Sequence, residues 1–154
     1  MGARRQGRIL AFQALYAYEY THPPLEELLQ FAWLDTSPED DASETRKSSP
    51  TASRSREALD FARLLVAGTI ENICAIDDRI RGQLDHWDFS RIARVDLSIL
   101  RLSVYSLLYV DSIPASVTID EAVSLAREFG SSESYRFVNG VLDGIRRTQA
   151  AAEA

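Results

Sequence analysis

The apolar positions of residues 94–110 predict a helix that is buried on nearly all sides. The segment reads RVDLSILRLSVYSLLYV. A helix that is apolar nearly all round belongs in the middle of a domain. Short stretches also alternate as a strand would, but the phase breaks at Ile99-Leu100 and the run exceeds the roughly 4–8 residues of a strand. We therefore expect a central helix, interrupted after Arg94 only by Asp96, Ser98, Arg101, Ser103 and Ser106.

Asp96 and Arg101 mark the polar strip of this central helix, and several interpretations remain open for them. The strip either faces solvent or contacts a partner. Asp96 can also cap the start of the helix, where a carboxylate is favourable. Arg101 can equally tie two helices together.

Helical spacing of apolar residues predicts further helices on both sides. Thr118 with Glu121 fits a capping box at one helix start, and Gly130 fits a left-handed cap at its end. Ser131 or Ser132 then caps the last helix. The expected helices cover about 4–21, 25–34, 57–84, 118–129 and 133–148, with a short helical turn at 89–93 capped by Asp88.

The last of these helices contains conflicting signals. Asn139-Gly140 between apolar residues is a strong hairpin signal. The surrounding apolar positions nevertheless recur at helical spacing, and the chain offers no sheet partners, so we expect a helix. Gly140 and Gly144 lie four residues apart on one helical face, where small residues allow close approach of a neighbouring helix.

Residues 35–56 differ in kind from the rest of the chain. The segment reads DTSPEDDASETRKSSPTASRSR and has no large apolar residue. Such a composition cannot bury enough surface to offset the entropy of ordering. We predict a flexible insertion.

Composition places the 154-residue chain among ordinary globular proteins, with 45% apolar residues and a net charge of −6. The single cysteine, Cys74, excludes an internal disulfide framework and fits a reducing compartment. It lies beside an apolar stripe, which favours a core position. No run approaches the ~18 apolar residues of a membrane span, so we expect a cytoplasmic protein.

Arginines open the first helix, and no acid occurs before Glu19. Cations at a helix N-terminus oppose the helix dipole by about 0.3–1 kcal/mol each. This placement suggests that the arginines contact something outside the chain, although a frayed, solvated terminus would look the same. They are Arg4, Arg5 and Arg8.

Catalytic and metal-binding patterns are absent from the sequence. The two histidines, His22 and His86, have no cysteine or histidine at ligand spacing, so no metal or cofactor is expected. No phosphate-binding glycine loop and no nucleophile motif occurs. We expect a protein that is not an enzyme.

The motifs of the chain resemble those of one family, the NusB transcription antitermination proteins. The resemblance covers the chain except residues 35–56 and the extreme termini, and it is most specific from Val95 to Asp143. It rests on ARRQGRILAFQALYAYE, Leu65-Val66-Ala67-Gly68, Ile76-Asp77, Val95-Asp96, Ile99-Leu100-Arg101-Leu102, Ile113-Pro114, Thr118-Ile119-Asp120-Glu121-Ala122-Val123, Phe129-Gly130 and Arg136-Phe137-Val138-Asn139-Gly140-Val141-Leu142-Asp143.

The resemblance implies an all-α fold of two packed helical bundles with about six to seven helices. One NusB-like domain would span 1–154, with an N-terminal bundle at about 4–84, carrying the insertion, and a C-terminal bundle at about 88–148. It further implies a non-enzymatic RNA-binding protein. Family members pair with ribosomal protein NusE, bind the boxA element of nascent ribosomal RNA and join an antitermination complex on RNA polymerase.

The resemblance also implies roles for individual residues. The RNA-binding set would be Arg4, Arg5, Arg8, Tyr16, Glu133, Arg136 and Phe137, and Asp96 would contact the partner NusE. The polar strip of the central helix adds Arg101 to Asp96 as a candidate partner-binding residue. Gln6 stands where another arginine is usual, and Ile9 replaces an acidic residue, so the basic patch is thinner here. Packing alone is the alternative for Tyr16 and Phe137.

Two other functions stay open at this point. Some family members dimerise, so the chain could be a homo-oligomeric interaction protein that masks its RNA surface. The same helical domain also occurs fused to RNA cytosine methyltransferases, which would need a catalytic domain that this chain does not contain.

Overall fold

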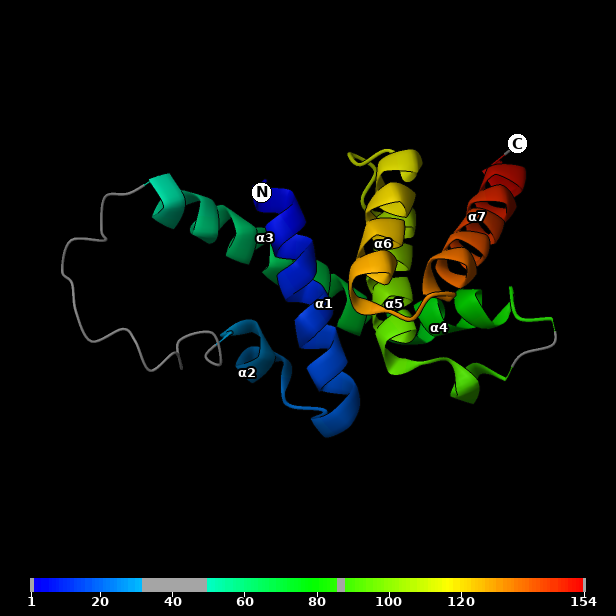
Figure 1. Cartoon of the computed structure of the whole chain (residues 1–154), viewed down its shortest axis with the longest axis horizontal. Coiled ribbons are helices and arrows are strands. Elements are labelled where there is room, and N and C mark those ends of the chain that lie inside the picture. Colours follow the sequence, from blue (N-terminus) through cyan, green and yellow to red (C-terminus); the bar gives the residue numbers. More distant parts are fainter. Residues whose placement is uncertain (1, 32–49, 86–87, 154) are drawn as a thin grey trace. The chain divides into compact units, whose positions relative to one another are not determined.

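The protein is all-helical in the part of the chain that the structure describes, residues 2–31, 50–85 and 88–153 of a computed structural model (Figure 1). These residues form seven α-helices and one short 3-10 helix, with no strand among them. The predicted fold class is therefore confirmed. The helices are α1 Ala3–Thr21, α2 Leu25–Leu29, α3 Pro50–Glu71, α4 Ile73–Arg81, η3 Phe89–Arg91, α5 Arg94–Tyr109, α6 Ala115–Phe129 and α7 Ser134–Glu153.

The chain divides into two compact units, Met1–Ala67 and Gly68–Ala154. The sequence places the end of the first bundle near residue 84. The compact units divide earlier because α4 packs against α5 and α7. The single NusB-like domain over 1–154 stays a prediction.

In the first unit, α1 packs closely against α3. A Cβ atom on Gly7 would lie 2.8 Å from the carbonyl oxygen of Ala58 and 2.9 Å from Cδ1 of Phe61. Glycine is therefore required at position 7 for space. The buried face of α1 comprises Gly7, Arg8, Ala11, Phe12, Ala14 and Leu15.

Helix α2 is shorter than the sequence predicts. It ends at Leu29, and Phe31 adopts a φ of 51°, in the left-handed region where a helix cannot continue. The Phe31 side chain is fully buried, which offsets the cost of that backbone conformation. The guanidinium Nε of Arg63 donates to the carbonyl of Leu29 at 2.9 Å and ties α3 to this end of α2. The predicted remainder of the helix, 32–34, lies outside the described residues.

Part of the predicted insertion is helical. α3 begins at Pro50, so residues 50–56 belong to its first turns, and proline suits the first position of a helix. The expectation of a flexible segment was wrong there. Residues 35–49 lie outside the described residues.

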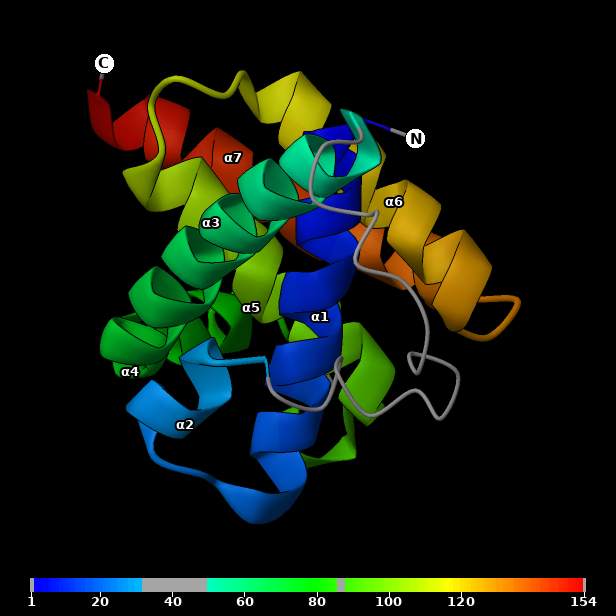
Figure 2. The same ribbon diagram turned by 90° about the vertical axis from the view of Figure 1, so that its left-hand side faces the viewer.

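In the second unit, α5 contacts α4, α6 and α7, as expected of a central helix (Figure 2). Its apolar residues Ile99, Leu100, Leu102 and Val104 are buried. Burying each such side chain stabilises the fold by roughly 1.5–3 kcal/mol.

The polar strip of α5 is buried too, so its interpretation as a solvent-facing strip was wrong. Within it, Ser98 donates to the carbonyl of Arg94 at 2.8 Å, and Ser106 donates to that of Leu102 at 3.3 Å. Their hydroxyls are thereby satisfied inside the helix.

The long helix predicted at 57–84 is broken at Asn72. The Asn72 amide donates to the carbonyl of Gly68 at 2.8 Å, and its backbone leaves helical geometry at φ −114° and ψ 19°. A side chain that binds the backbone in this way competes with the helix. Beyond the break the predicted stripe continues, and Ile76, Asp77 and Ile80 are buried. Cys74 is exposed, and its predicted core position was wrong.

Only some of the helix caps predicted from the sequence form in the structure. The carboxylate of Asp88 accepts from the backbone N–H of Ser90 at 3.1 Å, which confirms the predicted cap. By contrast, α6 starts after Pro114, three residues before Thr118, whose hydroxyl is buried in the helix instead of capping it. Gly130 has φ −93° and ψ −172°, so the predicted left-handed cap was wrong. Glycine is needed there because a Cβ would meet Oγ of Ser134 at 2.5 Å.

The last helix continues through Asn139-Gly140 as predicted, but it extends to Glu153, beyond the predicted end near residue 148. It starts at Ser134, and the backbone N–H of Ser131 donates to the Ser134 hydroxyl at 2.9 Å. The predicted cap was a Ser131 or Ser132 hydroxyl that accepts from a backbone N–H of the helix. In its place, the Ser134 side chain of the helix accepts from the backbone N–H that precedes it. A Cβ on Gly144 would overlap the side chain of Gln83, whereas one on Gly140 would meet nothing within 4 Å. Close helix approach thus explains only Gly144.

Candidate functional site

Four of the predicted site residues line one groove of the second unit. The groove has a volume of about 470 Å³. η3 and the residues after it provide one wall, the start of α5 provides Asp96, and the α6–α7 turn with the first turn of α7 provides the opposite wall. Its lining residues are Arg91, Ile92, Ala93, Asp96, Ser131, Glu133, Ser134, Arg136 and Phe137. Neither Arg91 nor Ile92 was predicted from the sequence, because no motif or spacing distinguishes them.

A second groove, of about 330 Å³, shares two of these residues, Arg136 and Phe137. The segment after α4 and the next turns of α7 complete it, including the exposed Gly140. The half-buried Phe137 therefore borders both grooves. A planar ring in this position can pack in the helix and still offer a surface to a bound molecule.

Charged groups of opposite sign meet at the start of α7. Nη1 of Arg136 lies 3.9 Å from Oε2 of Glu133, and both side chains are exposed. Nε of Arg136 donates to the Tyr135 hydroxyl at 3.0 Å. The pKa of Arg136 is raised above its ordinary value, first by this hydrogen bond and then by electrostatic interaction with Tyr135 and Glu133. The guanidinium is thus a permanent positive charge beside the groove.

Asp96 is more buried than a simple surface contact requires. Its side chain lies in the first turn of α5, where the helix dipole favours a carboxylate. It does not cap the helix, because Ala93 occupies the cap position and no side-chain cap bond forms. Its Oδ1 is buried and has no hydrogen-bond partner. An unsatisfied buried oxygen costs about 1–3 kcal/mol.

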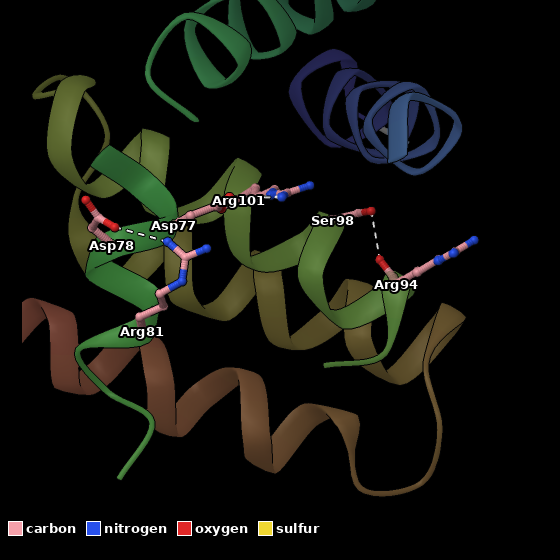
Figure 3. A network of polar contacts seen from close by, with 6 residues as sticks. All are labelled: Asp77, Asp78, Arg81, Arg94, Ser98 and Arg101. Carbon is pink, nitrogen blue, oxygen red and sulfur yellow. Dashed lines mark hydrogen bonds and ion pairs between the residues drawn. The ribbon is translucent and has the colours of Figure 1, made fainter. Parts of the chain in front are cut away.

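Arg101 is an internal tie between helices. Its Nε and Nη2 donate to Oδ1 and Oδ2 of Asp77, each at 2.9 Å, and link α5 to α4 (Figure 3). The Arg101 and Asp77 side chains are only 8% and 12% exposed. This geometry supports the internal role that the sequence left open, and we do not retain Arg101 as a partner contact.

The predicted site residues of α1 belong to the first unit. Arg4 and Arg5 are exposed, as an RNA contact requires, but Arg8 is buried. The guanidinium carbons of Arg4 and Arg8 lie 5.4 and 5.3 Å from the ring centroid of Phe61, within cation–π range. Arg8 therefore has a packing role that the sequence did not predict.

Tyr16 forms part of an aromatic row on α1. Its hydroxyl lies 2.8 Å from that of Tyr20, and the two rings meet edge to face with centroids 5.1 Å apart. Tyr16 is half-buried and Tyr20 is exposed. Such rings offer surfaces on which bases can stack.

Neither a metal-binding cluster nor a membrane-spanning helix occurs within the described ranges. Among these residues, no three His, Cys, Asp or Glu side chains gather closely enough to hold a metal ion. No helix in the same ranges has the length and hydropathy needed to cross a membrane.

Comparison with known proteins gives consistent matches along nearly the whole chain. The NusB family model matches residues 5–147. The transcription antitermination protein NusB of Treponema pallidum is 48% identical over 145 residues, which cover 94% of this chain and 93% of that protein. The NusB of Geobacter sulfurreducens is 43% identical and covers 96% of each chain.

Solved structures show the same fold. A structure of NusB from T. maritima is 35% identical, with a TM-score of 0.73 and coverage of 94% of this chain and 90% of that one. A structure of NusB and NusE in complex with double-stranded RNA is 23% identical, with a TM-score of 0.74 and coverage of 95% and 97%. By sequence motifs, family model and relatives over nearly its full length, this chain belongs to the NusB family.

Proposed function

We propose that the chain is an RNA-binding transcription antitermination factor of the cytoplasm that pairs with NusE and binds boxA RNA. The observation that carries this proposal is the groove between α5 and α7, which gathers Asp96, Glu133, Arg136 and Phe137. Relatives with 40–48% identity are named transcription antitermination proteins. As such a factor, the protein acts through binding and joins the complex on RNA polymerase without enzymatic activity.

The groove combines two features that suit single-stranded RNA. Phe137 offers a ring for base stacking, and the exposed guanidinium of Arg136 can bind phosphate oxygens in a bidentate manner. Unpaired bases are the parts of RNA that proteins recognise most readily by stacking. The exposed Arg4 and Arg5 and the half-buried Tyr16 of α1 would supply further contacts of the same kind.

NusE is the proposed protein partner, and Asp96 is the proposed contact. A neighbour of the same fold was solved as NusB with NusE and RNA. Asp96 lines the groove, which supports the assignment, because a partner seated there would meet this side chain.

Replacing Arg4 and Arg5 together by alanine is expected to weaken boxA binding by roughly tenfold or more near 0.1 M salt. Each lost phosphate contact also lowers the slope of log affinity against log salt by about 0.7 for single-stranded RNA. The measurement is a boxA titration at several salt concentrations, with and without NusE. Arg8→Ala is made separately, since the loss of its packing on Phe61 affects stability as well.

The matched control removes two exposed arginines from α7, Arg146 and Arg147. It changes the net charge by the same amount without touching α1. Equal affinity losses for the two double variants would reject α1 as an RNA contact. A parent protein whose boxA affinity does not fall with salt would reject the proposed function itself.

Replacing Glu133 by glutamine is expected to tighten boxA binding. The change removes a negative charge from the groove and releases Nη1 of Arg136 from the competing carboxylate 3.9 Å away. One charge near the phosphates should alter the affinity about threefold to tenfold, in line with a helix-surface interaction of about 1 kcal/mol. The same titration measures it, and a variant that binds no better than the parent would contradict the role given to Glu133.

Self-association and a methyltransferase fragment are the remaining alternatives. Sedimentation at several concentrations, with and without RNA, separates a monomeric binder from an oligomer that masks its RNA surface. The comparisons favour the antitermination alternative over the methyltransferase one, because the T. pallidum relative, matched over 93% of its own length, is named a transcription antitermination protein.

A further inference from the structure

Two arginines from different helices lie against one tyrosine at the α6–α7 turn. The guanidinium carbon of Arg127, in the last turn of α6, is 4.7 Å from the ring centroid of Tyr135. That of Arg136, in the first turn of α7, is 5.6 Å from the same centroid. Both distances lie within the range of cation–π attraction. Both guanidinium groups therefore lie within cation–π range of the same ring.

Tyr135 also fixes the orientation of Arg136. Its hydroxyl accepts the Nε–H of Arg136 at 3.0 Å, which leaves the terminal nitrogens Nη1 and Nη2 for other acceptors. The acid nearest in sequence, Glu133, is 3.9 Å away from Nη1, a distance too long for a strong hydrogen bond. An acceptor from outside can therefore displace it easily.

We infer that Arg127, Tyr135 and Arg136 form a phosphate clamp for the RNA backbone beside the groove. The inference rests on the proposed RNA-binding function and adds Arg127 and Tyr135 to its contact surface. The two guanidinium groups bind phosphate oxygens, and Tyr135 positions them.

Phosphate fits this clamp better than a carboxylate of a protein partner. Arg136 and Phe137 are neighbours and line the same grooves, so a base stacked on Phe137 brings its own phosphate next to Arg136. The planar fork of arginine matches phosphate oxygens in a bidentate manner. Moreover, the net charge of the chain is −6, so a local pair of exposed cations is needed to attract a polyanion to this face.

Replacing Arg127 by alanine tests the clamp. One lost phosphate contact should lower boxA affinity roughly fivefold near 0.1 M salt and reduce the salt slope by about 0.7. Tyr135→Phe keeps the ring but removes the hydroxyl that accepts from Arg136. We expect it to lower affinity about twofold to threefold with an unchanged slope, because the charges remain and only their positioning is lost.

Arg146→Ala is the matched control, since it removes one exposed positive charge from α7 outside the clamp. Circular dichroism of each variant confirms that the fold is intact. If Arg127→Ala and Arg146→Ala change affinity and slope alike while the parent binds boxA, the clamp is wrong and the proposed function stands. A loss confined to NusE binding also overturns the clamp. A parent that does not bind boxA overturns both.

Discussion

Replacing Asp77 by alanine is expected to lower the free energy of unfolding by roughly 3–5 kcal/mol, because it removes the buried carboxylate that offsets the charge of Arg101. Both oxygens of Asp77 accept from Arg101 at 2.9 Å, and the pair is shielded from water. Without the carboxylate, the guanidinium stays in a medium that solvates charge poorly. Urea unfolding followed by helical circular dichroism measures the loss.

Asp78→Ala is the control for this experiment, since it removes the same side chain from the next position of α4. The carboxylate of Asp78 pairs with Arg81 at 3.0 Å, but the two side chains are 76% and 52% exposed (Figure 3). Exposed pairs contribute about 0–1 kcal/mol. Similar losses for the two variants would contradict the importance given to the buried pair.

An apolar replacement of the whole pair separates stability from binding. Asp77→Leu combined with Arg101→Met removes both buried charges, and such replacements are often neutral or stabilising by about 1–4 kcal/mol. If this double variant is stable and binds NusE as the parent does, Arg101 is a structural tie only. Loss of NusE binding in a stable double variant would restore Arg101 as a partner contact.

Replacing Gly68 by alanine is expected to destabilise the protein by up to about 2 kcal/mol, against the usual preference for alanine in a helix. A Cβ on Gly68 would overlap the ring of Tyr105, which stacks on Tyr109 with centroids 5.5 Å apart. Overpacking costs about 1–3 kcal/mol. Alanine recovers only about 1 kcal/mol through its helix propensity. Thermal and urea unfolding both measure the change.

Gly140→Ala should act in the opposite direction. Position 140 lies inside α7, and an added Cβ meets nothing within 4 Å. The helix-propensity gain of about 0.5–1 kcal/mol is therefore not offset by overlap. If both substitutions stabilise the protein, the close contact between Gly68 and Tyr105 does not exist in solution.

Helices whose apolar residues recur at helical spacing could be predicted from the sequence. Helix breaks that depend on a single side chain could not. Helices α1 and α5 have long runs of apolar residues and were predicted with ends close to those observed, whereas α7 was predicted with the right start but extends past the predicted end near residue 148. The break at Asn72 depends on one amide reaching the carbonyl of Gly68. An apolar stripe continues through such a position, so periodicity alone predicted a single helix and a buried Cys74.

The candidate site was predictable where the family resemblance supplies its residues in one short motif, and unpredictable where it depends on packing. Arg136, Phe137 and Glu133 are near neighbours in sequence, and the structure places them around one groove with Asp96. Arg101 and Asp77 are separated by 24 positions. Each of them is a charged residue among apolar ones in its helix. That pattern indicates that the side chain is buried, but it does not indicate which side chain pairs with it. Tyr135 and Arg127 left no sequence signal, because their contact forms across the turn between α6 and α7.

The exposed thiol of Cys74 has a practical consequence for measuring self-association. It is the single cysteine of the chain, and it faces solvent on α4. Oxidation in air can therefore join two molecules by a disulfide between their Cys74 thiols, and the product can only be a dimer. Such a covalent dimer would sediment as an oligomer and persist on dilution. Sedimentation in the presence of a reductant, or of the Cys74→Ser variant, isolates reversible association from this chemistry.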